Sequence, residues 1–298
     1  MAARVFSVCK RIVRCSLFRE RDARLIFNKV RSLSSSEEEY NFQTLTGDLE
    51  GIAVFSMNKA SSRNAISRDF LIQLQNAMDA VKYDKSLRVF IVKSDVPGTF
   101  CAGADLKERA KMKMEDVGRF VTMARNLVTE LYHLPVPTIA AIDGVALGGG
   151  LEFALACDLR IAGCSSKLGL VETRLAIIPG AGGTQHLPRL VGMSKAKELI
   201  FTAKILNGEE SEKIGLVNYV VEDNKVYDKA VEIASTILPQ GPIALTMAKN
   251  AMNRGTEVDL TSGLQFEEAL YAQVIPTKDR LEGLQAFKEK RKPVYKGE

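Results

Sequence analysis

The sequence contains no tryptophan and only two histidines, His133 and His186. Zinc and most transition-metal centres use several histidine or cysteine ligands, so a histidine-rich metal site is not expected. Of the five cysteines, two lie in the first 34 residues, and the other three lack the spacing of metal ligands. We therefore expect reduced structural thiols and no metal site.

Long apolar runs are also scarce. The segment 136–157 is largely apolar and long enough to be mistaken for a membrane span. It includes Asp143, Glu152 and four glycines, which a bilayer helix would rarely carry. A buried strand, a glycine turn and a buried helix explain it better, and we expect no membrane association.

Acidic residues are sparse in the first 34 residues, where nine lysines and arginines stand against Glu20 and Asp22. Apolar residues alternate with these cations, and a serine-rich stretch follows. This composition is typical of a mitochondrial transit peptide and predicts a location in the mitochondrial matrix, although a basic tail that binds an anionic partner would share it. The leader contributes +7 to a net charge of +5, so the remainder is near −2 and offers no broad basic surface for nucleic acid.

Strand patterns alternate with helix patterns along residues 35–240. Short apolar strands are expected at 51–57, 87–93, 137–143 and 158–163, and helices at 67–82, 115–132 and 149–157. This alternation predicts an α/β domain made of recurring β-β-α units. Residues 241–298 read as helices only, and their excess of apolar residues predicts packing on the core or on another subunit.

Two turns between a strand and a helix stand out: residues 100–107, with the sequence Phe-Cys-Ala-Gly-Ala-Asp-Leu-Lys, and residues 143–152, with three consecutive glycines. Glycines at a helix start let a ligand approach the main chain and leave free N–H groups there, where the helix dipole favours negative charge. A tight structural turn would have the same composition, so the glycines alone decide little.

Two acids sharpen the interpretation. Glu152 lies in an apolar helical run, and Glu172 follows just before a second glycine loop, residues 179–184. Acids in apolar surroundings are costly unless they are paired or protonated, and two carboxylates at one site push one pKa upward. Such a pair could serve as general base and general acid. The structural alternatives are that Glu152 only interacts with the helix dipole and that Glu172 is a surface residue.

Taken together, the motifs at 101–107, 146–152 and 179–185 resemble the enoyl-CoA hydratase/isomerase (crotonase) family over residues 42–298. The end of the chain is most similar to the family branch that hydrates 3-methylglutaconyl-CoA in mitochondrial leucine degradation, of which AU-rich-RNA binding is also known. The resemblance implies a spiral of β-β-α turns with a C-terminal helical region that forms trimers, often paired into hexamers. His186 stands where the family often has arginine.

The resemblance also implies site roles. The amides of Ala104 and Gly149 would form an oxyanion hole for the thioester oxygen, and Glu152 and Glu172 would hold water and exchange protons with the substrate. The coenzyme A arm would lie along the turn, at Ala102, Gly103, Ala104, Asp105, Leu106, Lys107 and Gly149. Coenzyme A is then part of the substrate, not a cofactor.

Three alternatives follow from the same residues. Enoyl-CoA isomerases and thioester hydrolases share the fold, although isomerases can work with one acid, so two acids favour a hydratase. RNA binding is implied only by the resemblance to this branch, whose members carry basic residues at three positions of a helix that matches residues 67–85. In this sequence those positions are Arg68, Ile72 and Asn76. One cation of three predicts weak or absent RNA binding, because phosphate contacts dominate affinity for nucleic acids.

Overall fold

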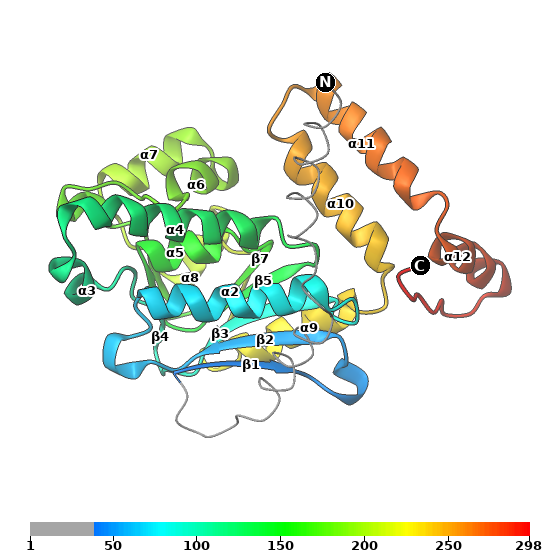
Figure 1. Ribbon diagram of the computed structural model, residues 1–298, viewed down its shortest axis with the longest axis horizontal. Coiled ribbons are helices and arrows are strands. Elements are labelled where there is room, and N and C mark those ends of the chain that lie inside the picture. The colour runs from blue at the N-terminus through cyan, green and yellow to red at the C-terminus, as the bar shows by residue number, and fades with distance from the viewer. Residues whose placement is uncertain (1–38) are drawn as a thin grey trace, which may run out of the picture. The chain divides into compact units, whose positions relative to one another are not determined.

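The large sheet runs through the core and has six strands in the order β1-β2-β3-β5-β7-β9 (Figure 1). Strand β1 is antiparallel to β2, and all the other pairs are parallel. The computed structural model describes residues 39–298, so the predicted transit peptide lies outside the described residues. The strands are β1 (Tyr40–Thr44), β2 (Ile52–Met57), β3 (Val89–Ser94), β5 (Thr138–Ile142), β7 (Leu159–Gly163) and β9 (Tyr219–Val221).

A second, parallel sheet consists of three short strands, β4 (Thr99–Cys101), β6 (Val145–Leu147) and β8 (Lys167–Gly169). Each successive stretch of chain adds one strand to the large sheet and the next strand to the small one: β3 then β4, β5 then β6, β7 then β8. The predicted α/β spiral of β-β-α units is therefore confirmed. The glycine turns follow β4 and β6, which places both of them at one edge of the small sheet.

Both faces of the large sheet are buried. In β3, Phe90 and Val92 belong to one apolar core, and Val89 and Ile91 belong to the other. Parallel sheets covered on both faces have such continuous apolar strands. Helices α2, α4 and α5 contribute to the first core and α9 to the second (Figure 1). Their bounds are α2 (Arg68–Tyr83), α4 (Met114–Tyr132), α5 (Gly149–Leu155) and α9 (Val226–Ile237).

Helix α2 begins where its sequence predicts. The hydroxyl of Ser67 accepts a hydrogen bond from the backbone N–H of Phe70 at 3.2 Å, which caps the helix. The apolar residues at helical spacing all face the core: Phe70, Leu71, Leu74, Ala77, Met78 and Val81 are buried. The spacing of the apolar residues and the Ser67 cap both indicate the same helix, and the structure confirms it.

The remaining helices flank this framework. The short α3 follows β4, and neither it nor the small sheet was expected from the sequence. Helices α10–α12 confirm the all-helical C-terminal region. The bounds are α3 (Leu106–Lys111), α6 (Gly183–Val191), α7 (Met193–Phe201), α8 (Gly208–Lys213), α10 (Pro242–Gly255), α11 (Leu260–Val274) and α12 (Lys278–Glu289), with 3-10 turns η1 (Gly47–Leu49), η2 (Ala60–Ser62) and η3 (Glu172–Leu175).

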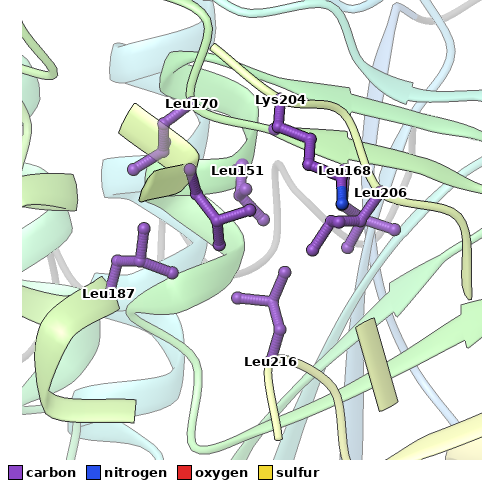
Figure 2. Close-up of a pocket in the computed structure, with 9 residues that line it drawn as sticks. Leu151, Leu168, Leu170, Leu187, Lys204, Leu206 and Leu216 are labelled. Carbon is purple, nitrogen blue, oxygen red and sulfur yellow. The ribbon is translucent and has the colours of Figure 1, made fainter. Parts of the chain in front are cut away.

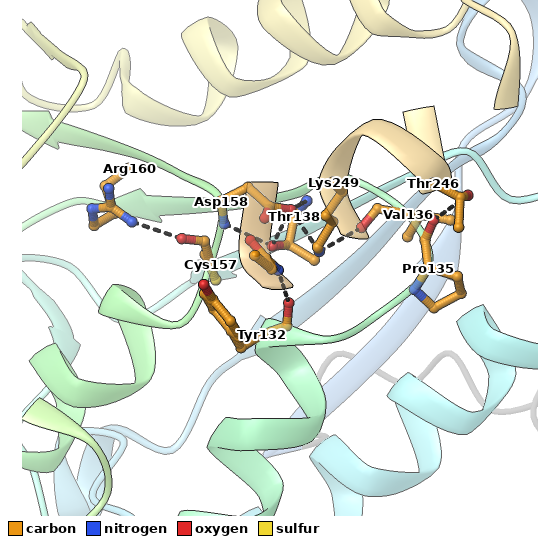
Figure 3. A network of polar contacts seen from close by, with 10 residues as sticks. Tyr132, Pro135, Val136, Thr138, Cys157, Asp158, Arg160, Thr246 and Lys249 are labelled. Atoms are coloured by element: carbon orange, nitrogen blue, oxygen red, sulfur yellow. Dashed lines mark hydrogen bonds and ion pairs between the residues drawn. The ribbon is translucent and has the colours of Figure 1, made fainter. Parts of the chain in front are cut away.

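A buried ion pair anchors α10 to the segment that follows α5 (Figure 3). The ammonium of Lys249, 6% exposed, lies 2.7 Å from a carboxylate oxygen of Asp158 and donates to the carbonyl of Val136 at 3.0 Å. The same Asp158 oxygen accepts from the backbone N–H of Thr138 at 2.8 Å. Lysine and aspartate rarely lie in a buried place unless they are paired and hydrogen bonded, and this pair is both.

No helix within residues 39–298 is long and apolar enough to cross a membrane.

Candidate active site

The turn after β4 presses against the turn after β6. Gly103 has φ +96°, and a Cβ there would lie 2.8 Å from the carbonyl oxygen of Leu147. The turn is held on its other side by Ile66, whose N–H donates to Gly103 at 2.7 Å and whose carbonyl accepts from Asp105 at 3.1 Å. Ala104 lies between these two bonds. Within residues 39–298 its own N–H donates to no acceptor.

The turn after β6 supplies a second free amide. Gly148 has φ +52° and ψ −128°, and its N–H donates to Gly169 of β8 at 2.8 Å. Gly149 then opens α5, where no residue of the helix can accept its N–H. A Cβ on Gly149 would lie 3.8 Å from the nitrogen of Ala104. Two half-buried amides, with no acceptor in the described part of the chain, therefore lie close together.

Glu152 projects from the first turn of α5 and is 3% exposed. One carboxylate oxygen accepts from the N–H groups of Ala181 and Gly183, each at 2.8 Å. Burial raises the pKa of Glu152, while these amides of the loop 179–183 and the positive charge of Arg125 act in the opposite direction. The donors favour the ionised form of this carboxylate.

Glu172, the first residue of η3, is 8% exposed and lacks such donors. Both of its carboxylate oxygens are buried without a hydrogen-bond partner among the described residues. Burial, and next the charge of Glu152, raise the pKa of Glu172 to about 7. A neutral carboxylic acid costs far less to bury than an ion, so this acid is substantially protonated near neutral pH.

The two carboxylates border the same glycine turn. A Cβ on Gly148 would lie 3.2 Å from an oxygen of Glu172, and a Cβ on Gly149 would lie 4.0 Å from an oxygen of Glu152. The structure thus brings together both acids and both predicted amides. It also separates them by environment, since one acid is held by N–H donors and the other is not.

The other predicted binding residues lie in two places, the turn after β4 and the start of α3. Ala102 and Gly103 lie in the turn itself, while Leu106 and Lys107 are exposed at the start of α3. Asp105 caps that helix, because its carboxylate accepts from the N–H groups of Lys107 and Glu108 at 2.9 and 3.0 Å. The carboxylate of Asp105 is therefore engaged within the protein.

Sequence reasoning missed the residues that hold Glu152. The loop 179–183 was noted for its glycines, but nothing in the sequence says that its amides point at an acid on another helix. His186, the departure noted from the sequence, packs on this loop, and a Cβ on Gly182 would lie 2.9 Å from its ring. Burial lowers the pKa of His186, so the ring is neutral near neutral pH.

A small cavity of about 10 Å³ is lined by neither of the two acids (Figure 2). Its volume is that of about one water molecule at most, too small for an acyl chain. Apart from a glycine and the stem of a lysine its lining is leucine: Leu151, Leu168, Gly169, Leu170, Leu187, Leu199, Lys204, Leu206 and Leu216. It is a packing gap, not a candidate substrate site.

A spiral α/β fold with two buried acids beside two free amides defines a class of protein suited to acid–base chemistry on a substrate that develops negative charge. Residues 47–298 match the family described as enoyl-CoA hydratase/isomerase, and the chain belongs to this family. The resemblance seen in the sequence motifs is thereby confirmed.

Particular relatives support the same placement. The chain is 57% identical over 267 residues to the mitochondrial methylglutaconyl-CoA hydratase of Mus musculus, covering 88% of this chain and 85% of that protein. It is 51% identical over 263 residues to the mouse mitochondrial enoyl-CoA hydratase domain-containing protein 2, covering 87% of this chain and 89% of that protein. The structure of an enoyl-CoA hydratase from Bacillus anthracis superimposes with a TM-score of 0.84 at 49% identity, covering 88% of this chain and all of that one. The names of both mouse relatives agree with a mitochondrial location for this chain.

Proposed function

We propose that this protein is an enoyl-CoA hydratase that adds water to 3-methylglutaconyl-CoA, a step of leucine degradation, in the mitochondrial matrix. The observation that carries the proposal is the pair of buried carboxylates, one with donors and one without, beside two free amides. The 57% identity to a methylglutaconyl-CoA hydratase supports this choice of acyl group.

In this mechanism the amides of Ala104 and Gly149 bind the thioester oxygen, with the coenzyme A arm along residues 102–107. Glu152, ionised, takes a proton from water as the water oxygen bonds to the β-carbon. The electron pair of the double bond moves toward the thioester oxygen, where the amides stabilise it, and losing one such donor costs roughly 10²–10³ in rate. Glu172, protonated, then delivers its proton to the α-carbon. No metal ion or cofactor enters this scheme.

The test compares Glu152→Gln and Glu172→Gln with Glu232→Gln, a control on α9 whose side chain is 64% exposed. Each catalytic variant should lose roughly 10²–10⁴ in turnover, because it loses a general acid or base, while its KM for the thioester changes little. The readout is the loss of the conjugated enoyl-thioester absorbance. Near-normal hydration by both variants would end this mechanism.

The acyl group is tested by a panel of enoyl-CoA esters. The proposal expects the highest kcat/KM for 3-methylglutaconyl-CoA, above straight-chain and branched monocarboxylic esters. A preference for a straight-chain ester would reassign the substrate and leave the hydratase chemistry in place. Migration of a double bond without addition of water would instead favour the isomerase alternative.

Self-association is the second part of the proposal. Helix α11 buries none of its side chains within residues 39–298, although it carries several large apolar ones. Exposed examples on α11 and α12 are Leu260, Leu264, Tyr271, Leu281, Leu284 and Phe287. Large exposed apolar side chains gathered on two helices are typical of an interface, which supports a trimer or hexamer. Light scattering on the purified protein measures the mass directly.

RNA binding is proposed to be weak. On α2, Arg68 lies 3.7 Å from Glu108, and Ile72 and Asn76 provide no charge. Lys82 of the same helix pairs with Glu130 at 3.1 Å. A submicromolar, strongly salt-dependent complex with AU-rich RNA at physiological salt would overturn this part.

A further inference from the structure

The loop 179–183, which holds Glu152, is itself held by α4. The Nε–H group of Arg125 donates to the carbonyl oxygen of Gly180 at 2.9 Å. The next N–H along the chain, that of Ala181, donates to Glu152 at 2.8 Å. One peptide unit therefore accepts from a cation on one side and donates to a carboxylate on the other.

The geometry of the peptide bond couples these two contacts. A trans peptide is planar, with its C=O and N–H pointing in opposite directions, so fixing the carbonyl fixes the direction of the N–H. A cation at the carbonyl also polarises the peptide and strengthens the bond that its N–H makes. The side chain of Arg125 thus acts on Glu152 without touching it.

Packing supports the same arrangement. A Cβ on Gly180 would lie 3.0 Å from the Cγ1 of Val121, and a Cβ on Gly182 would lie 3.6 Å from the Cγ1 of Val128. Val121, Arg125 and Val128 are spaced by four and three residues, so they share one face of α4. The loop rests against this face, with one apolar contact on each side of the charged contact made by Arg125.

We propose that Arg125 is a positioning residue for Glu152: its guanidinium fixes the Gly180–Ala181 peptide so that the Ala181 N–H is presented to the carboxylate. This inference rests on the proposed hydratase function. It assigns to Arg125 no contact with substrate.

The charged and titratable groups around Glu152 are few. Glu172 faces it from η3 and Arg125 lies near it on α4. His186 of α6 packs on Gly182 as a neutral ring. Removing Arg125 therefore removes a cation that acts on Glu152, and weakens the N–H donor of Ala181.

The test measures pH–rate profiles for Arg125→Met, Arg125→Gln and Arg125→Lys. The methionine variant should lose roughly tenfold in kcat with little change in KM, since misplacing a catalytic group from a distance is costly. Its acidic limb should move to higher pH, because an ionised Glu152 becomes harder to form. The lysine variant keeps a charged donor, so it should recover most of the rate and move the acidic limb back toward its original pH. The glutamine variant has a neutral donor and should recover less.

The matched control is Arg119→Met on the same helix, where the arginine is exposed and lies 3.9 Å from Asp116. This variant should behave like the unaltered protein, and thermal unfolding should give similar midpoints for all four variants. A methionine variant whose profile overlays that of the unaltered protein would overturn the inference. So would an equal loss at every pH that lysine does not restore, which indicates a general structural role. If the unaltered protein hydrates no enoyl-CoA, the proposed function fails first, and the two failures are distinguishable.

Discussion

At the scale of single residues, the candidate site gives two identical side chains different surroundings. Glu152 receives two N–H donors, and Glu172 receives none within the described residues. A sequence shows two glutamates twenty positions apart and cannot show which one is protonated. The structure separates them, because donors stabilise a charged carboxylate and burial without donors disfavours it.

This difference predicts a pH dependence. The pKa of Glu172 is raised to about 7, and the proposed mechanism needs it protonated. Raising the pH through 7 removes that proton, so kcat/KM should fall along a basic limb centred near pH 7. A profile of kcat/KM between pH 5 and 9 measures it. A rate that stays level from pH 6 to 9 would contradict the assignment of Glu172 as the acid.

The same residue predicts a cost in stability. Because its folded-state pKa lies above the ordinary value of 4.5, the unfolded chain loses this proton more readily. The contribution of Glu172 is most favourable below pH 4.5 and declines as pH rises to about 7. Glu172→Gln, which stays neutral, should therefore raise the free energy of unfolding at pH 8 by up to about 3 kcal/mol, and change little near pH 4.5. Urea unfolding at the two pH values tests this, and equal effects at both would refute it.

At the scale of elements, glycines decide how closely the turns approach. Gly150 lies in α5 where a Cβ would come 2.3 Å from the carbonyl oxygen of Cys101 on β4. Gly150→Ala must push the helix off the strand, and we expect it to cost about 1–3 kcal/mol or more. It should also lower turnover, because α5 carries both Gly149 and Glu152.

Gly118→Ala provides the matched comparison for this variant. Gly118 lies inside α4, and nothing comes within 4 Å of the position of its Cβ. Alanine there should stabilise the helix by about 0.5–1 kcal/mol. Urea midpoints of the two variants should therefore move in opposite directions. Equal midpoints would show that the contact between α5 and β4 adjusts freely.

Many of the helices and strands were predictable from the sequence, for identifiable reasons. Helix α2 has both a regular apolar period and a serine cap, and β2, β3 and β5 are runs of apolar residues. The three-residue strands β4, β6 and β8 are too short to show any period, so the small sheet was missed. The donors to Glu152 were missed because they are backbone groups, which carry no signature in the sequence.

At the scale of the whole molecule, a buried ion pair between Lys249 and Asp158 joins α10 to the core, beside the bond from Thr246 to the carbonyl of Pro135. Replacing Lys249 by methionine leaves the Asp158 carboxylate partly buried without its counter-ion. Breaking such a pair from one side is strongly destabilising, and we expect about 3 kcal/mol here. Unfolding in urea measures the loss, and limited proteolysis shows whether α10 is released.

Two comparisons sharpen that test. Lys278 forms an exposed pair with Glu298, so Lys278→Met should change stability little. The double variant Lys249→Met with Asp158→Asn should recover part of the loss, because the uncompensated charge is gone. If Lys249→Met is no more disruptive than Lys278→Met, the contact does not hold α10.

The donors that hold Glu152 come from positions 29 and 31 residues later in the chain. During synthesis this acid therefore leaves the ribosome well before the groups that make its burial tolerable. An N-terminal fragment ending before residue 181 would carry the glycine turn and the glutamate, yet would have no means of keeping that carboxylate charged in a dry interior. Catalytic competence should thus arrive late and all at once, when the following turn of the spiral docks, with no partly active shorter product.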